Sequence, residues 1–209
     1  MNINKYYCFE IYLIILFIFI LIFFFCYLLY IYIYIYCGNY SWVDCDVIIT
    51  NPNIKLETFL PPMEKNDLHL IISSDNNGIN AGIFFLRVHP WSLSYMNRSV
   101  SYAFTHQASF IYYSDQTSMN NVLFESNGSE NEHFAIVPQK WFNMYVAETT
   151  PGYLLIHLAG VTIKDVRARH LRELILNNTR YYSKTSEEMR KEVEEFYQHP
   201  IQYELILND

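Results

Sequence analysis

The sequence predicts an α/β domain with a mixed sheet, preceded by a long apolar segment. Short apolar runs typical of strands alternate with stretches typical of helices, and clusters of turn residues separate them. The first forty residues differ from the rest, because they are strongly apolar and almost uncharged. In α/β sheets ligands bind at the carboxyl ends of strands, so polar side chains at those ends are the candidates for function.

The apolar segment covers residues 11–36. No charged residue occurs between Ile11 and Val43, a run longer than the roughly 20 residues that a helix needs to cross a bilayer. We therefore expect residues 1–10 to form a short cytoplasmic tail and residues 11–36 a transmembrane helix, with the body of the protein lumenal because Lys5 precedes the span. The alternative is a low-complexity apolar segment, since Ile and Tyr alternate near its end.

The body of the chain supplies the predicted strands and helices. Strands are expected at the apolar runs 42–49, 68–72, 79–88, 135–138 and 153–158. Helices are expected from Pro90 to about Ser101, from Ser114 to Phe124 with Ser114 as N-cap, and from Thr185 onward.

Two clusters of apolar side chains are predicted to be scaffold. In the last helix, Thr185 and Glu188 resemble a capping box, and one helical face carries Met189, Val193, Phe196 and Tyr197. A buried aromatic cluster is expected from Trp141, Phe142 and Tyr145.

Two aspartates one residue apart, Asp44 and Asp46, lie in the first apolar run. Side chains at positions i and i+2 of a strand leave the same face, so both carboxylates could share one hard divalent ion such as Mg²⁺ or Mn²⁺, with Cys45 turned back into the core. The alternative is a strand that ends in a turn, because Asp is a turn residue and a second turn sequence starts at Asn51.

Composition narrows the classes of partner. The net charge is −7 and the basic residues are scattered, so the basic stripe of a nucleic-acid-binding protein is missing and no nucleic acid partner is expected. Four Asn-x-Ser/Thr triplets would accept N-linked glycans if the body lies in the secretory lumen; they start at Asn39, Asn97, Asn127 and Asn177. With the apolar segment, they favour a single-pass type II membrane protein of the Golgi or the endoplasmic reticulum.

Five sequence blocks in a fixed order resemble glycosyltransferase family 34, which holds fungal galactosyl- and mannosyltransferases and plant xylosyltransferases. The blocks begin at Trp42 (Trp-Val-Asp-Cys-Asp), Asn76 (Asn-Asn-Gly-Ile-Asn-Ala-Gly), Ser114 (Ser-Asp-Gln), Val137 (Val-Pro-Gln-Lys-Trp-Phe-Asn) and His157 (His-Leu-Ala-Gly). The resemblance covers about residues 41–170. It implies a GT-A-type nucleotide-diphospho-sugar transferase fold and transfer with retention at the anomeric carbon. The implied donor is UDP-galactose or GDP-mannose, and the implied acceptor is a glycan.

The resemblance also implies a metal site. Asp44 and Asp46 match the family's Asp-x-Asp motif, and His157 matches the late histidine that completes the site beside the diphosphate. Imidazole with two carboxylates suits Mn²⁺ better than Mg²⁺. From the residues alone, a histidine at a strand end is more often an ordinary satisfied histidine.

Further roles follow from the resemblance alone. The catalytic pair is Asp115 and Gln116, although an acid in the first turn of a helix has a structural explanation too. The residues implied to bind the donor sugar and diphosphate are Asn77, Asn80, Ala81, Gly82, Gly160 and Lys164. The spacing between His157 and this lysine differs from the family pattern.

The predicted function is a retaining, metal-dependent glycosyltransferase that moves a hexose from a nucleotide-sugar donor to a glycan acceptor. Residues 41–209 would form its domain. The family places roughly a hundred residues of nucleotide-binding βα units ahead of the aspartate pair, and residues 1–40 do not match them. We therefore expect a domain without its N-terminal nucleotide-binding half, and the alternative function is an inactive, membrane-anchored glycosyltransferase-like fragment or a truncated gene product.

Overall fold

The computed structural model of the chain describes residues 38–106, 114–200, 203, 205 and 207. The chain divides into two compact units, residues 1–40 and 41–209. The predicted transmembrane segment, residues 11–36, lies outside the described residues. Within the described part of the chain, every helix is too short or too polar to cross a membrane.

Among residues 38–106 and 114–200, the strands form two mixed sheets where the sequence predicted one. Sheet A has four strands in the order β1 (Asn39–Val43), β4 (Gly78–Arg87), β3 (Leu70–Asp75) and β5 (Phe134–Val137). Sheet B has three strands in the order β2 (Val47–Ile49), β7 (Leu155–His157) and β6 (Met144–Tyr145). Each sheet contains an antiparallel pair, β3 with β4 and β2 with β7, and a parallel pair, β3 with β5 and β6 with β7. The predicted mixed α/β fold is confirmed.

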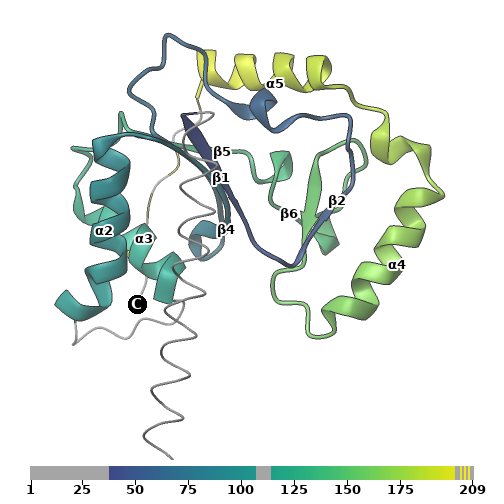
Figure 1. Cartoon of the computed structure of the whole chain (residues 1–209), viewed down its shortest axis with the longest axis horizontal. Helices are drawn as coiled ribbons and strands as arrows, with labels where there is room; N and C mark the ends of the chain where they lie inside the picture. Colours follow the sequence, from purple (N-terminus) through teal and green to yellow (C-terminus); the bar gives the residue numbers. More distant parts are fainter. Residues whose placement is uncertain (1–37, 107–113, 201–202, 204, 206, 208–209) are drawn as a thin grey trace, which may run out of the picture. The chain divides into compact units, whose positions relative to one another are not determined.

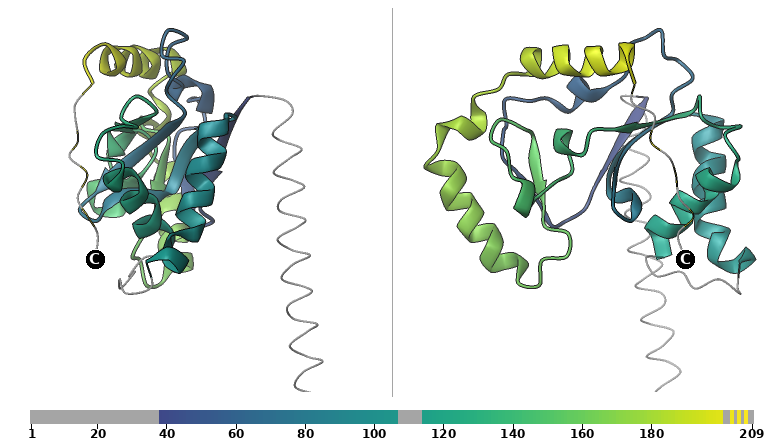
Figure 2. Two further views of the ribbon diagram at one scale, coloured as in Figure 1. Left: turned by 90° about the vertical axis from the view of Figure 1, so that its left-hand side faces the viewer. Right: turned by 180° about the vertical axis from the view of Figure 1, so that it is seen from behind.

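In the described part of the chain, four helices and four short 3₁₀ segments accompany the sheets. The helices are α2 (Pro90–Thr105), α3 (Ser114–Glu125), α4 (Lys164–Leu176) and α5 (Ser186–Gln198). The 3₁₀ segments are η1 (Leu56–Phe59), η2 (Gln139–Trp141), η3 (Val146–Glu148) and η4 (Thr179–Tyr182). In Figures 1 and 2, α2 and α3 lie beside sheet A, and α4 lies on the opposite side of the domain beside sheet B. Helix α5 runs across one end.

The larger core joins α5 to sheet A. The face of α5 predicted to be apolar is buried against side chains of β3, β4 and the segment around η2. Phe59 is at its centre, with its ring centroid 5.3–6.2 Å from those of Phe85, Trp141 and Phe142. The predicted capping box of α5 is present, with Thr185 and Glu188 bonded reciprocally to backbone N–H groups. The scaffold role predicted for α5 therefore agrees with its packing.

A smaller core joins α4 to sheet B. Its buried residues include Leu171 and Ile175 of α4 and Met144, Ile156 and Leu158 of the sheet. Helix α4 and strand β6 were not predicted from the sequence. The helix buries only two residues fully, and the strand is two residues long, so neither produces a clear apolar pattern.

The pairing of β3 with β4 is irregular at one point. Ile72 pairs with Phe84, but the next residue, Ser73, pairs with Asn80, so three residues of β4 have no partner in the register. These residues are Ala81, Gly82 and Ile83. Such a bulge redirects the backbone and often lies next to a functional site. Here it brings Gly82 toward the ends of β1 and β7.

Candidate metal centre

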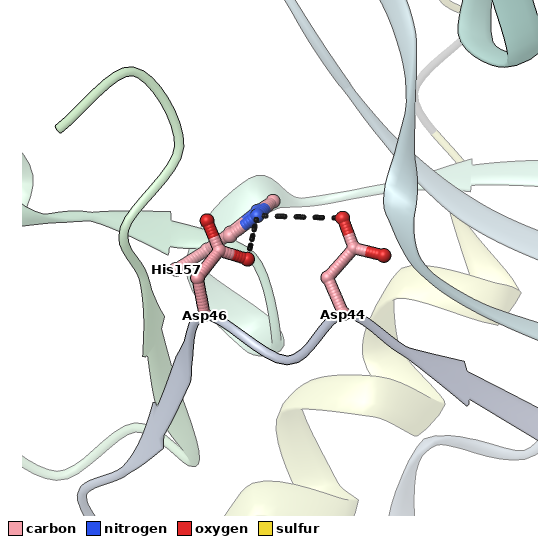
Figure 3. A group of neighbouring side chains, drawn as sticks. All are labelled: Asp44, Asp46 and His157. Carbon is pink, nitrogen blue, oxygen red and sulfur yellow. Dashed lines mark ion pairs between the residues drawn. The ribbon is translucent and has the colours of Figure 1, made fainter. Parts of the chain in front are cut away.

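Asp44 and Asp46 lie in the tight turn between β1 and β2, so the prediction of one continuous strand was wrong. The turn is fixed on both sides by backbone hydrogen bonds, from Asp44 N to Gly82 O at 2.8 Å and from Leu158 N to Asp46 O at 2.9 Å. Cys45 is exposed and does not turn into the core, because the middle residue of this turn faces solvent. The turn leaves both carboxylates facing the end of β7 (Figure 3).

The structure brings Asp44, Asp46 and His157 together, as the sequence predicted. One ligand atom from each residue lies within 4.8 Å of the other two. The Nε2 atom of His157 is 3.3 Å from Asp46 Oδ1 and 3.9 Å from Asp44 Oδ2 (Figure 3). These spacings are well inside the ~6–7 Å beyond which the three side chains would need to rearrange to share an ion.

The buried partner of His157 fixes which ring nitrogen faces the carboxylates. His157 is 4% exposed, and its Nδ1 lies 2.7 Å from Asn143 Oδ1. Asn143 is fully buried and donates through its amide nitrogen to Ser73 Oγ at 2.8 Å. Because the amide nitrogen is used in this way, the amide oxygen faces the imidazole, and Nδ1 of His157 carries the proton. The Nε2 lone pair is then directed at the two aspartates, as in a metal-ligating histidine.

Gly82 is required by the position of His157. A Cβ atom at residue 82 would lie 2.3 Å from Cε1 of His157, 3.0 Å from its Nδ1 and 3.1 Å from Asn80 Oδ1. A real Cβ cannot approach the buried ring so closely. The glycine of the Asn-Ala-Gly block therefore lets the strand backbone lie directly against the imidazole.

The charged groups of the site carry more negative than positive charge. Burial raises the pKa of Asp44, and the negative charges of Asp46 and Asp115 raise it further. The hydrogen bond from Trp42 and the proximity of His157 oppose this, and the net pKa of Asp44 is above its usual value. Burial would also raise the pKa of Asp46, but the hydrogen bond from Lys164 and the proximity of His157 lower it below its usual value. The Nζ atom of Lys164 lies 2.6 Å from Asp46 Oδ2. A divalent cation would compensate the remaining negative charge.

The residues predicted to face the donor sugar surround the bulge of β4. Asn80 is 4% exposed, and its amide group is bonded within the protein: Nδ2 donates to Asp75 and Tyr145, and Oδ1 accepts from Gly82 N at 3.0 Å. The Asn77 N–H donates to Asp75 Oδ1 at 2.7 Å.

Gly160, which was predicted to contact the diphosphate, lies in the exposed turn after β7. Its φ is 71°, which favours glycine.

The predicted catalytic pair is near the centre at the start of α3. Gln116 accepts a hydrogen bond from the Ala81 N–H through Oε1 at 3.3 Å, so it contacts the bulge directly. Asp115 is exposed in the first turn of α3, and its charge is close enough to raise the pKa of Asp44, after the larger effect of burial. The structure therefore places Gln116 against the bulge beside the metal centre. Asp115 lies in the exposed first turn of α3, where its Oδ1 accepts from the Gln116 N–H at 2.8 Å.

Three residues of the site were not assigned to it from the sequence. Asn143 belongs to the block Val-Pro-Gln-Lys-Trp-Phe-Asn, where only its family match could have indicated a role. Tyr145 was predicted to lie in the buried aromatic cluster, which was wrong: it is half-buried, and its ring centroid is 6.1 Å from that of His157. Asp75 ends β3, where it accepts hydrogen bonds from Tyr145 and Asn80.

Comparison with known proteins agrees with the resemblance seen in the sequence. The sequence model of the galactosyl transferase GMA12/MNN10 family matches residues 61–168, which include His157 and the bulge of β4 and begin after Asp44 and Asp46. A curated relative is an uncharacterized alpha-1,2-galactosyltransferase of Schizosaccharomyces pombe, 28% identical over 127 residues that cover 56% of this chain and 32% of the relative. The chain thus spans about a third of the length of that relative. The family match covers more than half of the chain, and the protein belongs to the galactosyl transferase GMA12/MNN10 family of glycosyltransferases.

Proposed function

We propose that the protein is a retaining, metal-dependent hexosyltransferase that moves galactose or mannose from UDP-galactose or GDP-mannose to a glycan acceptor. The observation that carries this proposal is the convergence of Asp44, Asp46 and the Nε2 atom of His157, in a chain that belongs to a galactosyltransferase family. A GT-A-type arrangement and a Golgi address, with the chain anchored through residues 11–36, complete the proposal.

The residues fit a divalent cation, and Mn²⁺ is the one that the ligand set favours. Two carboxylates and one imidazole nitrogen form a mixed oxygen and nitrogen site, and the Asn143 hydrogen bond already directs the imidazole. Such an ion acts as a Lewis acid and neutralises charge on a departing diphosphate. Lys164, paired with Asp46, and the backbone at Gly160 would supply further contacts to the phosphates.

The residues around the bulge have proposed roles in binding and transfer. Asn77, Asn80, Ala81 and Gly82 would form the wall that faces the donor sugar, with Gly82 allowing close approach of the backbone. The carboxylate of Asp115 would stabilise positive charge that develops at the anomeric carbon, and Gln116 would hold a sugar hydroxyl.

The test starts with the 209-residue protein and Mn²⁺. Titration calorimetry should show one Mn²⁺ site that Asp46→Asn removes and that Asp67→Asn, the same substitution at an exposed residue ahead of β3, leaves intact. Incubation with each nucleotide sugar and oligosaccharide acceptors should then give a Mn²⁺-dependent product, absent with Asp46→Asn, in which the anomeric configuration of the donor is retained.

Each result has a different consequence. Mn²⁺ binding without transfer from either donor would refute the enzymatic proposal for this chain and favour the alternative, a glycosyltransferase-like protein without activity. A wild-type protein that binds no Mn²⁺, or an Asp46→Asn variant that binds it as well as wild type, would refute the metal centre itself.

A further inference from the structure

Behind the metal centre, a network of hydrogen bonds joins Asp75, Tyr145 and Asn80. We propose that Asp75 and Tyr145 are positioning residues, which hold the Asn80 side chain so that the bulge of β4 keeps Asp44 and His157 in place. The inference rests on the proposed function, because it concerns the geometry of the same metal centre. It assigns these two residues a role that neither the sequence blocks nor the family resemblance gives them.

Asp75 is the acceptor at the centre of the network. Its Oδ1 accepts from the Asn77 N–H at 2.7 Å, and its Oδ2 accepts from Asn80 Nδ2 at 2.9 Å and from the Tyr145 hydroxyl. All three partners are donors, which suits a carboxylate because it only accepts. Burial and the hydrogen bond to Asp75 both raise the pKa of Tyr145, so its hydroxyl keeps its proton.

The Asn80 amide can satisfy this network in one orientation only. Its Nδ2 donates to Asp75 and, at 2.8 Å, to the Tyr145 oxygen, so Oδ1 faces the Gly82 N–H at 3.0 Å. A flipped amide would set its oxygen against the Asp75 carboxylate and its nitrogen against the Gly82 N–H. Asp75 and Tyr145 together therefore determine which atom of Asn80 meets Gly82.

Gly82 transmits this constraint to both sides of the metal centre. Its carbonyl oxygen accepts from the Asp44 N–H at 2.8 Å, and its Cα atom faces the ring of His157 where a side chain would otherwise lie. Tyr145 pairs with His157 in the register of β6 and β7. The network thus connects sheet A, which supports the aspartate turn, with sheet B, which carries the histidine.

The first test compares two tyrosines that both donate to a carboxylate. Tyr145→Phe removes the hydroxyl from the network, while Tyr153→Phe removes one that lies 3.3 Å from Glu192 and away from the site. In the 209-residue protein we expect Tyr145→Phe to weaken Mn²⁺ binding about tenfold, the lower end of what outer residues of metal sites contribute, and Tyr153→Phe to leave it unchanged.

The second test does not depend on metal binding. Amide hydrogen exchange, measured by NMR, should be about tenfold faster at Asp44 and Gly82 in Tyr145→Phe, with no change at the amides of α5, because only local opening is affected. Asp75→Asn should have the same effect. The new amide group has a single oxygen. That oxygen can accept either from Tyr145 and Asn80 or from the Asn77 N–H, but not from all three.

The outcomes separate this inference from the proposed function. Wild-type Mn²⁺ affinity and wild-type exchange at Asp44 and Gly82 in both variants would overturn the positioning role, and so would faster exchange throughout the domain, which indicates general destabilisation. If Asp46→Asn abolishes Mn²⁺ binding while Tyr145→Phe does not change it, only the positioning role is lost. If Asp46→Asn has no effect, the metal centre itself is refuted.

Discussion

At the scale of single residues, the contact between Gly82 and His157 is the tightest constraint on the site. We predict that Gly82→Ala displaces the imidazole, because the new Cβ would lie 2.3 Å from its Cε1 atom. The overpacking should lower the free energy of unfolding by about 1–3 kcal/mol. It should also weaken Mn²⁺ binding at least about tenfold, since a ligand no longer faces the aspartates. Urea unfolding and titration calorimetry measure the two effects.

Gly128→Ala is the matched control for this prediction. Gly128 has a φ of 82°, so alanine there is strained, but its Cβ would come no closer than 3.4 Å to a neighbouring side chain. It lies in the turn after α3 and should lower stability without affecting Mn²⁺ binding. Equal losses of metal affinity in both variants would contradict the specific role of Gly82.

A second prediction concerns the hydrogen bond between Asn143 and His157. Asn143→Leu leaves the Nδ1–H of a buried histidine without an acceptor, which should cost about 1–3 kcal/mol of stability and free the ring to change tautomer. Asn143→Asp keeps an acceptor at the same place. Long-range ¹H–¹⁵N NMR should therefore show the Nδ1–H tautomer of His157 in wild type and Asn143→Asp, and its loss in Asn143→Leu. The same tautomer in all three proteins would refute the role of Asn143 in fixing the tautomer of His157.

The sequence predicted the members of the metal cluster better than their surroundings. Asp44, Asp46 and His157 were identified because carboxylates in an apolar run and a family match restrict the chemistry strongly. The roles of Asn143 and Tyr145 depend on contacts between separate segments of the chain; Asn143 and His157, for example, are 14 positions apart. No local pattern encodes such contacts.

At the scale of elements, the apolar runs located most strands within a few residues. The strand predicted at 79–88 is β4 at Gly78–Arg87, and the one predicted at 135–138 is β5 at Phe134–Val137. The run 42–49 was misread because its apolar ends belong to two sheets, and the polar turn between them carries the aspartates. The helix from Pro90 continues to Thr105, beyond the predicted end at Ser101, because no breaker residue follows.

A third prediction tests the scaffold role of α5. Met189 of α5 is fully buried in the larger core, so Met189→Ala should lower the free energy of unfolding by about 2–5 kcal/mol through the lost contacts and the cavity. Met63→Ala, the same substitution at a residue that is 83% exposed, should change stability little. At a temperature where both variants are folded, Mn²⁺ affinity should match wild type. A selective loss of affinity in Met189→Ala would show that α5 contributes to the site.

At the scale of the whole domain, the candidate site depends on how two small sheets meet. The aspartate turn is the shortest connection from sheet A to sheet B, and its backbone bonds tie it to the bulge of β4 at Gly82 and to Leu158 at the end of β7. The geometry of the site therefore depends on both sheets. A cluster of histidines at the other end of β3 provides a way to change the stability of the domain without altering a residue of the site.

His69, just ahead of β3, is 5% exposed and stacks on His89 and His133, with ring centroids 3.8 Å and 5.2 Å away. Burial, and then the charges of His89, His133 and Arg87, lower the pKa of His69 from 6.5 to about 4, against a smaller opposing effect of Asp67. Neutral His69 is therefore favoured in the folded protein, whereas the unfolded chain takes up a proton as the pH falls below 6.5.

The fourth prediction follows from this difference in proton binding. The contribution of His69 to stability is fully present above pH 6.5 and is lost as the pH falls toward 4, at up to about 1.4 kcal/mol per pH unit. His69→Phe keeps an aromatic ring in the stack but cannot take up a proton, so its free energy of unfolding should fall less steeply than that of wild type between pH 6.5 and pH 4.5. Urea unfolding at four pH values measures both slopes, and His170→Phe, at an exposed position of α4, should follow the wild-type slope. Parallel slopes for wild type and His69→Phe would mean that His69 accepts its proton equally well in the folded and unfolded protein.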